Sequence, residues 1–338
     1  MAKILVLGGT SWLGGTVAAS AVAQGHEVTC LARGQSGAAP TGARLVTGDR
    51  DDAGAYAALP RSETWDLVVD VARQPGHVRG AVKALSARAE HWTFVSSGSV
   101  YASHDAPQAD ESAALLPALA ADTAAPEEYG EAKVACEQAV VHARGPGALI
   151  VRPGLIVGHG DLSERFGYWP ARFALAVEDE APVLVPARRD RPVQWIDAED
   201  LAGWILVAGL SGVTGVYDAV GARTPLGAVL DTAARVAGFS GRVLAASDDD
   251  LRAAGVEEFM GPRSLPLWLA DPDWQGFQDR SGARAADKGL RQRPLADTMA
   301  DALSWERLLG LARSRTRAGL DRAEELSIIS ELASRTQG

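Results

Sequence analysis

The sequence predicts a doubly wound α/β fold, in which helices cover both faces of a parallel β-sheet. Short runs of β-branched and aliphatic residues alternate with helix-length segments through the first half of the chain. These runs are apolar at consecutive positions, which is typical of parallel strands that are buried on both faces. A glycine-rich turn also follows the first run directly and precedes the first helical segment. Together these observations predict strand–helix–strand units joined by right-handed crossovers.

Each element has its own local signal. Strands are expected at the apolar runs 4–7, 28–31, 44–47, 67–71, 93–96, 149–152 and 215–219. Helices are expected at 14–24, 77–88, 130–144, 200–210, 226–236, 295–311 and 323–332. Gly25 ends the first helix and Gly145 with Pro146 ends the third, because glycine suits a helix cap and proline cannot continue a helix.

The composition is that of a globular protein. Hydrophobic residues make up 47% of the 338 residues, which is enough for a sizeable core. The 43 acidic and 33 basic residues give a net charge of -10, and no basic stripe offsets it, so a nucleic acid partner is not expected. No apolar run approaches the roughly 18 residues of a membrane helix, so no membrane association is expected.

The cysteines and histidines indicate neither a disulfide framework nor a metal centre. Cys30 and Cys136 are too far apart in the sequence for a zinc knuckle and are interpreted as buried small hydrophobic residues. A reducing compartment, the cytoplasm, fits this usage. The six histidines show no spacing typical of metal ligands, so no metal is expected.

The turn "GGTSWLGG" has the features of a phosphate-binding loop. Gly8 can take the tight turn after the strand, and Gly14 allows the helix to pack closely. The amides at the helix start would then face a pyrophosphate. Ser11 replaces the middle glycine of a G-x-x-G-x-x-G arrangement, which lowers the specificity of the motif. The residues expected to contact a dinucleotide here are Gly8, Thr10, Ser11, Trp12, Leu13 and Gly14.

The ends of the second and third strands bear on which dinucleotide binds. Arg33 stands where an acidic residue would accept a hydrogen bond from the adenosine ribose. A guanidinium suits a 2'-phosphate, so NADP(H) is favoured over NAD(H), although a solvated surface arginine is the alternative interpretation. Asp49 is either a contact of the adenine amino group or a turn residue.

Tyr129 and Lys133 form the candidate catalytic pair. They lie one helical turn apart in "YGEAK", so both side chains project from one helix face. An ammonium beside a phenol favours the phenolate, which makes the pair a general acid and base near neutral pH. The pair follows the fifth strand, and parallel sheets bind ligands at the carboxyl ends of their strands. Ser97, at that end, would offer its hydroxyl to a substrate oxygen.

Four motifs occur in the order and spacing of a known family. The segments "GGTSWLG", "FVSSGSVY", "YGEAK" and "VRPGLIVGHGD" resemble the extended short-chain dehydrogenase/reductases, the NAD(P)-dependent epimerase/dehydratase family. The resemblance covers about residues 3 to 240, and "GGTSWLG" with "ARG" is most similar to the atypical branch of that family. It implies a Rossmann-like doubly wound parallel sheet with a smaller C-terminal substrate-binding lobe.

The resemblance also implies roles for individual residues. Tyr129 matches the proton donor, Ser97 the catalytic Ser/Thr, and Lys133 the residue that also holds the nicotinamide ribose. The backbone of Arg152, Pro153 and Gly154 is implied to lie along the nicotinamide. The residues assigned to the dinucleotide outside the glycine turn and the Arg33 region are Val71, Ala72, Lys133, Pro153, Gly154 and Leu155. Relatives often dimerise through the two helices that flank the catalytic site, so a homodimer is an expectation.

The chain is expected to divide near residue 155. Residues 1–155 would form the dinucleotide-binding Rossmann domain, and residues 156–338 mainly the substrate-binding lobe, where prolines break the chain into short pieces. Elements near 193–236 are expected to rejoin the Rossmann core. The long segment 102–128 is either a lid or a surface loop.

Departures from the family pattern reduce the number of reactions that are expected. Gly98 and Ser99 occupy the places of the Asp-Glu pair that supplies acid and base in the 4,6-dehydratases, so dehydration is not expected. Val193 occupies the place of the arginine that grips the diphosphate of a nucleotide sugar. Arg191 lies two residues earlier and could reach that group, so a nucleotide-sugar substrate loses support without being excluded.

The substrate is expected to be a small molecule with a ring and a polar group. The segment "ERFGYWPARFA" carries aromatic side chains and an arginine that suit such a ligand, although core packing would explain the same residues. The candidate substrate residues are Ser97, Ser99, Tyr168, Trp169, Arg172 and Gln194.

The leading hypothesis is an NADPH-dependent ketoreductase, an oxidoreductase that reduces a carbonyl on a small cyclic or sugar-like molecule. The alternative is an NAD-dependent sugar epimerase, which oxidises a sugar carbon and returns the hydride to the other face. A second alternative is a non-catalytic, dinucleotide-binding regulator on the same fold. Such cofactor sensors commonly lose the Tyr and Lys, which this chain retains, so an enzyme is favoured.

Overall fold

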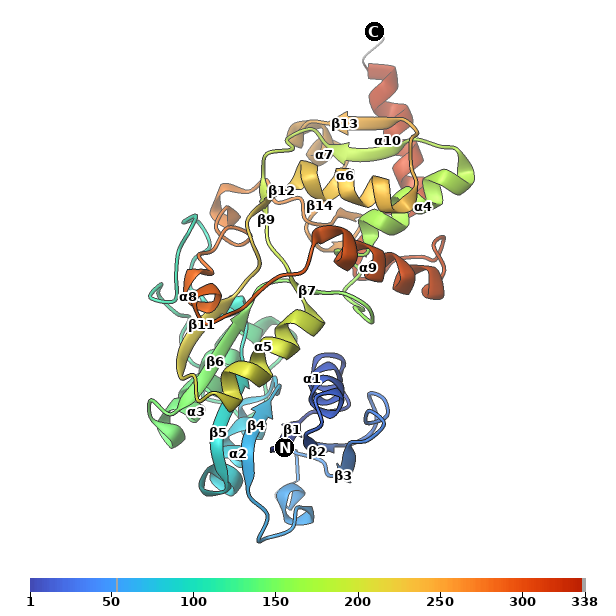
Figure 1. Ribbon diagram of the computed structural model, residues 1–338. Helices are drawn as coiled ribbons and strands as arrows, with labels where there is room; N and C mark the ends of the chain where they lie inside the picture. Colours follow the sequence, from blue (N-terminus) through green and yellow to red (C-terminus); the bar gives the residue numbers. More distant parts are fainter. Residues whose placement is uncertain (53, 336–338) are drawn as a thin grey trace. The chain divides into compact units, whose positions relative to one another are not determined.

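The structure is a computed structural model that describes residues 1–52 and 54–335. The chain forms two compact units (Figure 1). Unit 1 combines three stretches, Met1–Leu155, Ala198–Gly221 and Arg280–Gln292. Unit 2 combines Ile156–Asp197, Ala222–Asp279 and the chain from Arg293 onward.

Unit 1 is built around a seven-stranded sheet in which all neighbouring strands are parallel. Its strands are β1 (Lys3–Leu7), β2 (Glu27–Ala32), β3 (Arg44–Thr47), β4 (Trp65–Asp70), β5 (Ala89–Val95), β6 (Ala148–Pro153) and β11 (Gly215–Ala219). Their order is β11-β6-β5-β4-β1-β2-β3. The order reverses at β1, which lies between β2 and β4, and doubly wound sheets bind ligands at such a switch point. The predicted fold class is confirmed.

Helices cover both faces of this sheet. They are α1 (Trp12–Ala23), α2 (Pro75–Leu85), α3 (Tyr129–Arg144), α5 (Ala198–Leu210) and the short α8 (Ala283–Asp287). Val68 of β4 belongs to the core cluster that α2 and α3 complete. Its neighbour Leu67 points to the other face, where Gly209 of α5 is so close that an added Cβ would lie 2.8 Å from the leucine side chain. Helices α1 and α5 pack together on that second face.

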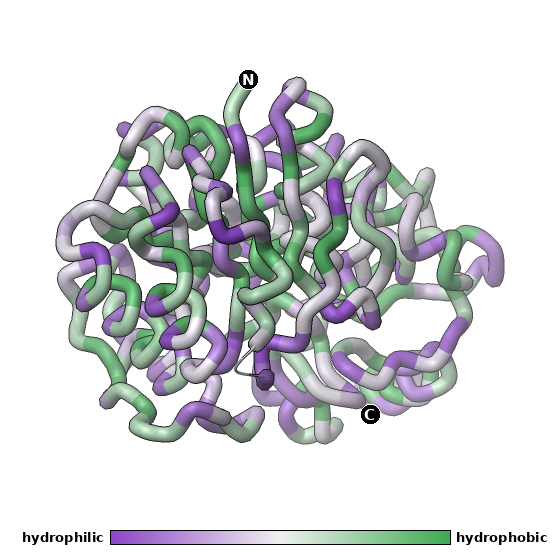
Figure 2. The backbone as a smooth tube through the Cα atoms, turned by 90° about the horizontal axis from the view of Figure 1, so that it is seen from below, coloured by the Kyte–Doolittle hydropathy of each residue, from purple (hydrophilic) through white to green (hydrophobic). Residues whose placement is uncertain are grey.

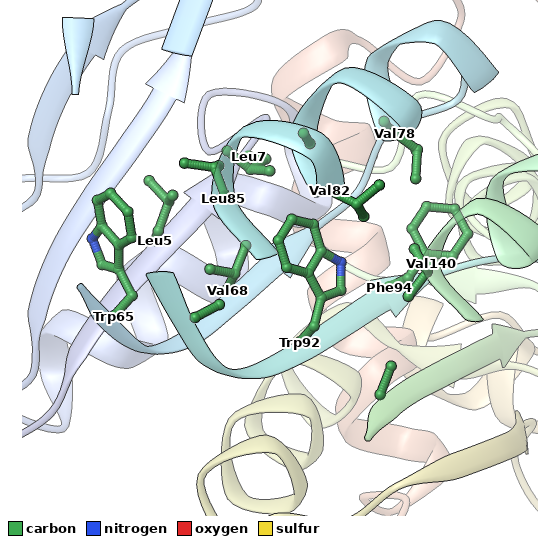
Figure 3. Close-up of a cluster of buried hydrophobic side chains, with 14 of the residues drawn as sticks. Leu5, Leu7, Trp65, Val68, Val78, Val82, Leu85, Trp92, Phe94 and Val140 are labelled. Atoms are coloured by element: carbon green, nitrogen blue, oxygen red, sulfur yellow. The ribbon is translucent and has the colours of Figure 1, made fainter. Parts of the chain in front are cut away.

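The core between the sheet and the pair α2 and α3 is large and fully apolar (Figure 3). Trp92 and Phe94 of β5 are completely buried there, and Val82 of α2 and Val140 of α3 approach them from the helices. Each such side chain contributes roughly 1.5–3 kcal/mol by leaving water. This packing fixes α3, and therefore the catalytic candidates on it, against β5.

Four single turns of 3₁₀ helix connect the elements of unit 1. They are η1 (Ala55–Ala58), η2 (Ser86–Arg88), η3 (Gly98–Val100) and η4 (Pro126–Glu128). Two of them flank the candidate catalytic residues, since Ser97 caps η3 and Tyr129 follows η4 directly.

Unit 2 consists of helices with short strand pairs. Its helices are α4 (Tyr168–Asp179), α6 (Leu226–Ala237), α7 (Asp248–Ala253), α9 (Leu295–Leu309), α10 (Arg322–Arg335) and the turn η5 (Pro272–Trp274). Its strands are β7 (Ile156–Val157), β8 (Val183–Pro186), β9 (Pro192–Val193), β10 (Ile196–Asp197), β12 (Thr224–Pro225), β13 (Val243–Ala246), β14 (Glu257–Glu258), β15 (Gly261–Pro262), β16 (Ser264–Leu265) and β17 (Ala318–Gly319). Helix α4 packs against α6 and α9, and β8 pairs with β13 in parallel.

Two expectations about this half of the chain agree with the structure only in part. The prolines do not leave only short pieces, because α4 is a twelve-residue helix with Pro170 as its third residue. A proline is tolerated there, since the first-turn N–H groups have no intrahelical acceptor. Of the elements near 193–236, α5 and β11 belong to unit 1, whereas α6 packs in unit 2. The segment 280–292 also belongs to unit 1, which was not expected.

Hydrophobic stretches along the chain are short and alternate with hydrophilic ones (Figure 2). Among the described residues, no helix combines the length and the apolar character that crossing a membrane requires.

Candidate active site

The candidate catalytic and cofactor residues lie at one edge of the unit 1 sheet. Because all seven strands are parallel, the loops that follow β1, β4, β5 and β6 emerge at the same edge. The glycine turn follows β1, Ala72 follows β4, and Ser97 follows β5. The parallel arrangement of the strands therefore brings these loops together, although they are far apart in the sequence.

The glycine turn is as tight as the sequence predicts. Gly8 has a φ of +93°, which favours glycine, and its N–H donates to Leu31 O of β2 at 2.9 Å. A Cβ on Gly14 would lie 2.2 Å from Gly8 O, and a Cβ on Gly9 would lie 2.4 Å from Cys30 Sγ. The backbone therefore passes too closely for any side chain at these positions. The sequence analysis did not single out Gly9. Its importance follows from the close approach of Cys30 on the neighbouring strand β2.

Ser11 has a structural task that a middle glycine could not perform. It is the N-cap of α1, and its Oγ accepts a hydrogen bond from Gly14 N at 3.3 Å. The same hydroxyl donates to Gly8 O at 2.7 Å. The serine that replaces the middle glycine thus joins the two ends of the turn through its hydroxyl. The helix start, including Leu13 at its second position, still presents amides to an anion, so the cradle fits a dinucleotide pyrophosphate.

Arg33 and Asp49 face each other beyond β2 and β3. The Arg33 Nη1 lies 3.9 Å from Asp49 Oδ2, and the two side chains are 50% and 38% exposed. An acidic group beside the arginine reduces the positive charge offered to a 2'-phosphate. The geometry therefore keeps both dinucleotides compatible with this region.

Lys133 is buried at the centre of the site. It is 2% exposed, and its Nζ donates to Ala72 O and to Val95 O, both at 2.7 Å. These carbonyls follow β4 and end β5, so one ammonium ties both strand ends to α3. An ammonium has three donors, and the third has no acceptor among the described residues, so it is left for a ligand.

Tyr129 and Ser97 lie next to the contact between the start of α3 and the loop after β5. Tyr129 is half-buried at the first position of α3, with the Lys133 Nζ 5.9 Å from its ring centroid. Gly130 packs on the loop after β5 so closely that a Cβ would lie 2.4 Å from Ser99 O. Ser97 Oγ accepts from Ser99 N and donates to Ser99 Oγ, each at 3.1 Å. The start of α3 is therefore held directly against the serine loop.

A buried ion pair lies behind these residues. Arg152 Nε and Nη2 donate to the two carboxylate oxygens of Glu137 at 2.9 and 2.7 Å. Ser96 Oγ donates to the same carboxylate at 2.5 Å. Glu137 lies one turn after Lys133, so this network joins α3, the end of β5 and the end of β6. The sequence analysis did not identify it.

Tyr101 extends this network and is packed rather than catalytic. Its hydroxyl donates to Asp218 Oδ1 at 2.6 Å and accepts from Arg152 Nη1 at 3.0 Å. Arg280 lies over its ring at 3.4 Å and donates Nε to Asp218 Oδ2 at 2.8 Å. Burial, with the neighbouring Asp218 carboxylate, raises the pKa of Tyr101 well above its usual value. Tyr101 therefore stays protonated and holds a hydrogen bond instead of transferring a proton.

The other residues expected at the dinucleotide lie around the same edge. Val71 borders the glycine turn, since a Cβ on Gly8 would lie 2.8 Å from its side chain. Pro153 and Leu155 are buried, and Gly154 approaches Val220 so closely that a Cβ would lie 3.0 Å from it.

The substrate roles expected for residues of unit 2 are contradicted by burial. Tyr168 and Trp169 are 0% exposed, and Trp169 Nε1 donates to Pro266 O at 2.8 Å. Arg172 is 5% exposed and pairs with Glu325 at 3.1 Å. Gln194 is likewise 5% exposed. These side chains form the interior of unit 2, so Ser97 and Ser99 are the candidate substrate residues that the structure leaves accessible.

Metal ligands do not gather in the part of the chain that the structure describes. There, no three His, Cys, Asp or Glu side chains are grouped so that they could hold a metal ion. Cys30 and Cys136 are both buried and free, and burial raises the pKa of both thiols, to about 11 and about 12.

Comparison with known proteins assigns the family. The model of the NAD dependent epimerase/dehydratase family matches residues 4–87 and 81–217. The chain belongs to this family. No curated protein sequence matches the chain significantly.

Solved structures of epimerases share the fold. The UDP-Glc/GlcNAc 4-epimerase of Campylobacter jejuni is 16% identical with a TM-score of 0.67, over 91% of this chain and 100% of that one. The UDP-N-acetylglucosamine 4-epimerase of Bacillus cereus is 16% identical with a TM-score of 0.63, over 91% and 100%. The UDP-glucuronic acid 4-epimerase of Bacillus cereus, solved with NAD, is 14% identical with a TM-score of 0.61, over 91% and 99%. At these identities the similarity shows the Rossmann-like fold.

Proposed function

We propose that this member of the NAD dependent epimerase/dehydratase family is an epimerase that inverts a hydroxyl-bearing carbon of a sugar-like molecule. The observation that carries the proposal is the position of Lys133, which is buried one turn after Tyr129 with one donor left for a ligand. The family and the epimerases among the solved structures with this fold support epimerisation over the ketoreductase that the sequence analysis favoured.

The side chains of this site have distinct tasks in such a reaction. A bound nicotinamide dinucleotide supplies the acceptor and donor of the hydride. Tyr129 takes the proton of the substrate hydroxyl as its carbon becomes a carbonyl, and returns a proton to the oxygen when that carbon is reduced. Ser97 donates a hydrogen bond to the same oxygen. Lys133 holds the ligand with its third donor and keeps positive charge beside the phenol.

Inversion needs no acid and base pair for the loss of water. Gly98 and Ser99 occupy the positions where a dehydratase carries that pair, and Ser99 is engaged with Ser97. Release of the substrate hydroxyl as water would lack a group to protonate it. These residues favour proton transfer at one oxygen over the loss of water.

A second candidate is an NADPH-dependent ketoreductase. The observation that favours it is Arg33, a half-exposed guanidinium just after β2 that lies 3.9 Å from Asp49. A 2'-phosphate could compete with that long ion pair, because a phosphate offers a forked, charge-assisted contact. NAD remains the cofactor of the leading proposal.

Two measurements separate these activities. Purified protein is incubated with NAD⁺ and with UDP-glucose, UDP-N-acetylglucosamine or UDP-glucuronate, and the configuration at C4 is followed by proton NMR. A panel of cyclic ketones is then mixed with NADPH while the nicotinamide absorbance is followed. An epimer supports the proposal, whereas NADPH oxidation without any epimer would contradict it in favour of the reductase. A homodimer also remains a proposal, which sedimentation velocity would test.

A further inference from the structure

Arg73 lies in the loop after β4, between two residues that are both held by hydrogen bonds. The carbonyl of the preceding residue, Ala72, accepts the Lys133 ammonium at 2.7 Å. The following residue, Gln74, accepts from Ala124 N at 2.7 Å and donates to Ala124 O at 3.3 Å. The loop after β4 is thus tied to α3 on one side and to the segment before Tyr129 on the other. These contacts hold the backbone on both sides of Arg73.

The segment that precedes Tyr129 is held to the same loop by further contacts. Gly76 N donates to Asp122 O at 2.8 Å. Arg79 of α2 donates to Asp122 Oδ1 at 2.5 Å and to the carbonyls of Leu119 and Ala121 at 3.1 and 3.0 Å. This part of the segment 102–128 is therefore bound to α2 by hydrogen bonds and an ion pair. Hydrogen bonds between the loop after β4 and the segment before Tyr129 therefore fix the backbone of Arg73 relative to that of Tyr129.

The Arg73 guanidinium lies over the catalytic phenol. Its Cζ is 5.2 Å from the Tyr129 ring centroid, while the Lys133 Nζ is 5.9 Å from the same centroid. Arg73 is exposed, and within residues 1–52 and 54–335 it makes no hydrogen bond and no ion pair. The buried arginines Arg50 and Arg152 of unit 1, in contrast, are paired with Asp70 and Glu137. A guanidinium that rests on a ring keeps its N–H donors at its edges, where they can bind a planar anion.

We propose that Arg73 is a binding residue for an anionic group, a phosphate or a carboxylate, of the ligand whose oxygen Tyr129 serves. The fork of a guanidinium matches such a group, and its place on the ring puts the anion close to the reacting carbon. The anion belongs either to the substrate, as a carboxylate or phosphate near the inverted carbon, or to the dinucleotide. This inference rests on the proposed function for the role of Tyr129, but its test requires no turnover.

The test uses inorganic phosphate as the probe and Tyr129 as the reporter. Protein labelled with [¹³Cζ]tyrosine is titrated with phosphate, first stripped of dinucleotide and then saturated with NADH, and the Tyr129 signal is assigned with Tyr129→Phe. A saturable shift of that signal is expected in at least one of the two states. Arg73→Gln should weaken the apparent phosphate affinity about tenfold. Arg73→Lys should give an intermediate affinity, because the charge stays while the fork is lost.

Arg61→Gln is the matched control. Arg61 is also exposed and loses the same charge, but it lies in the turn before β4, at the opposite end of that strand. Its phosphate response should equal that of the unaltered protein. A shift that does not saturate in either state, or one that persists with equal affinity in Arg73→Gln, would overturn the proposal.

The two states distinguish the sources of the anion. If the phosphate response survives in the NADH-saturated protein and the NADH dissociation constant is unchanged in Arg73→Gln, the anion belongs to the substrate. If NADH abolishes the response and Arg73→Gln weakens NADH binding about tenfold, it belongs to the dinucleotide. A protein that shows the Arg73 response but no epimerisation would retain this inference while the proposed function fails.

Discussion

Glu137 and Arg152 face each other through two parallel hydrogen bonds in the interior of unit 1, although both are charged and both are at most 5% exposed. Glu137 belongs to helix α3, which also carries Tyr129 and Lys133, and Arg152 belongs to β6, in the segment whose backbone is expected at the nicotinamide. Ser96 joins the pair from β5. The three segments that carry the candidate site are therefore held by one carboxylate.

Removing that carboxylate should destabilise the protein strongly. Glu137→Gln leaves the Arg152 guanidinium buried without its counter-charge, which costs about 3–5 kcal/mol of unfolding free energy in comparable pairs. Urea denaturation measures this loss. Glu131→Gln, on the same helix, has no recorded side-chain partner in the described chain and should change stability by about 0.5 kcal/mol or less. Equal stability of the two variants would refute the structural role of the pair.

Gly14 should be indispensable for dinucleotide binding, whereas its neighbour should not. Gly14→Ala would place a Cβ 2.2 Å from Gly8 O, so the glycine turn must open. Gly15→Ala would place its Cβ at an ordinary 3.6 Å from Gly9 O. Fluorescence titration with NADH should therefore show a large loss of affinity for Gly14→Ala and little change for Gly15→Ala. Matching affinities in the two variants would show that the dinucleotide does not lie on this turn.

Loss of the Tyr129 hydroxyl should separate chemistry from binding. Tyr129→Phe is expected to lower kcat about 10²–10⁴-fold, because general acid–base catalysis contributes that much, while the NADH dissociation constant stays the same. Tyr217→Phe is the control, since Tyr217 lies on the edge strand β11 and its hydroxyl donates to Thr214 O, just before that strand. Unchanged turnover in Tyr129→Phe would refute its assignment as the proton donor.

His91 should make stability depend on pH. Burial, reinforced by the charge of Arg144, lowers the pKa of this histidine on β5 below its usual value. The unfolded chain then binds the proton more readily, so stability is lost as pH falls below about 6.5, down to the folded-state pKa. His104 has a pKa lowered in the same direction and adds to this slope.

Replacing His91 should flatten that profile. His91→Gln is expected to reduce the fall in urea midpoint below about pH 6.5, whereas His142→Gln, exposed on α3, should keep the original profile. An unaltered pH dependence in His91→Gln would show that the folded protein accommodates the protonated ring.

The strands and main helices of unit 1 could be predicted because their signals are local. The runs 44–47 and 215–219 coincide with β3 and β11, and the segment 130–144 lacks only the first residue of α3. Parallel strands buried on both faces read as continuous apolar runs, and glycines mark the turns between them. The glycine turn and the pair of Tyr129 and Lys133 are visible for the same reason.

The charged network could not be predicted, because nothing local distinguishes a buried charge from a solvated one. Asp218 and Arg280 are 62 positions apart, and each would be read as a surface residue. The opposite error was made for Tyr168 and Trp169, whose aromatic rings were assigned to a ligand but fill the interior of unit 2. Only the fold decides whether such a side chain meets a ligand or another helix.

Unit 1 consists of three separate stretches of the chain, and its edge strand β11 comes after the unit 2 stretch Ile156–Asp197. During synthesis, β6 therefore leaves the ribosome with an unpaired edge and keeps it until β11 has emerged. The contacts of Arg280 with the Asp218 carboxylate and the Tyr101 ring form still later, because Arg280 follows both residues in the chain. A fragment cut at residue 155 would expose the same unpaired edge permanently, so it is expected to aggregate rather than to serve as an autonomous domain.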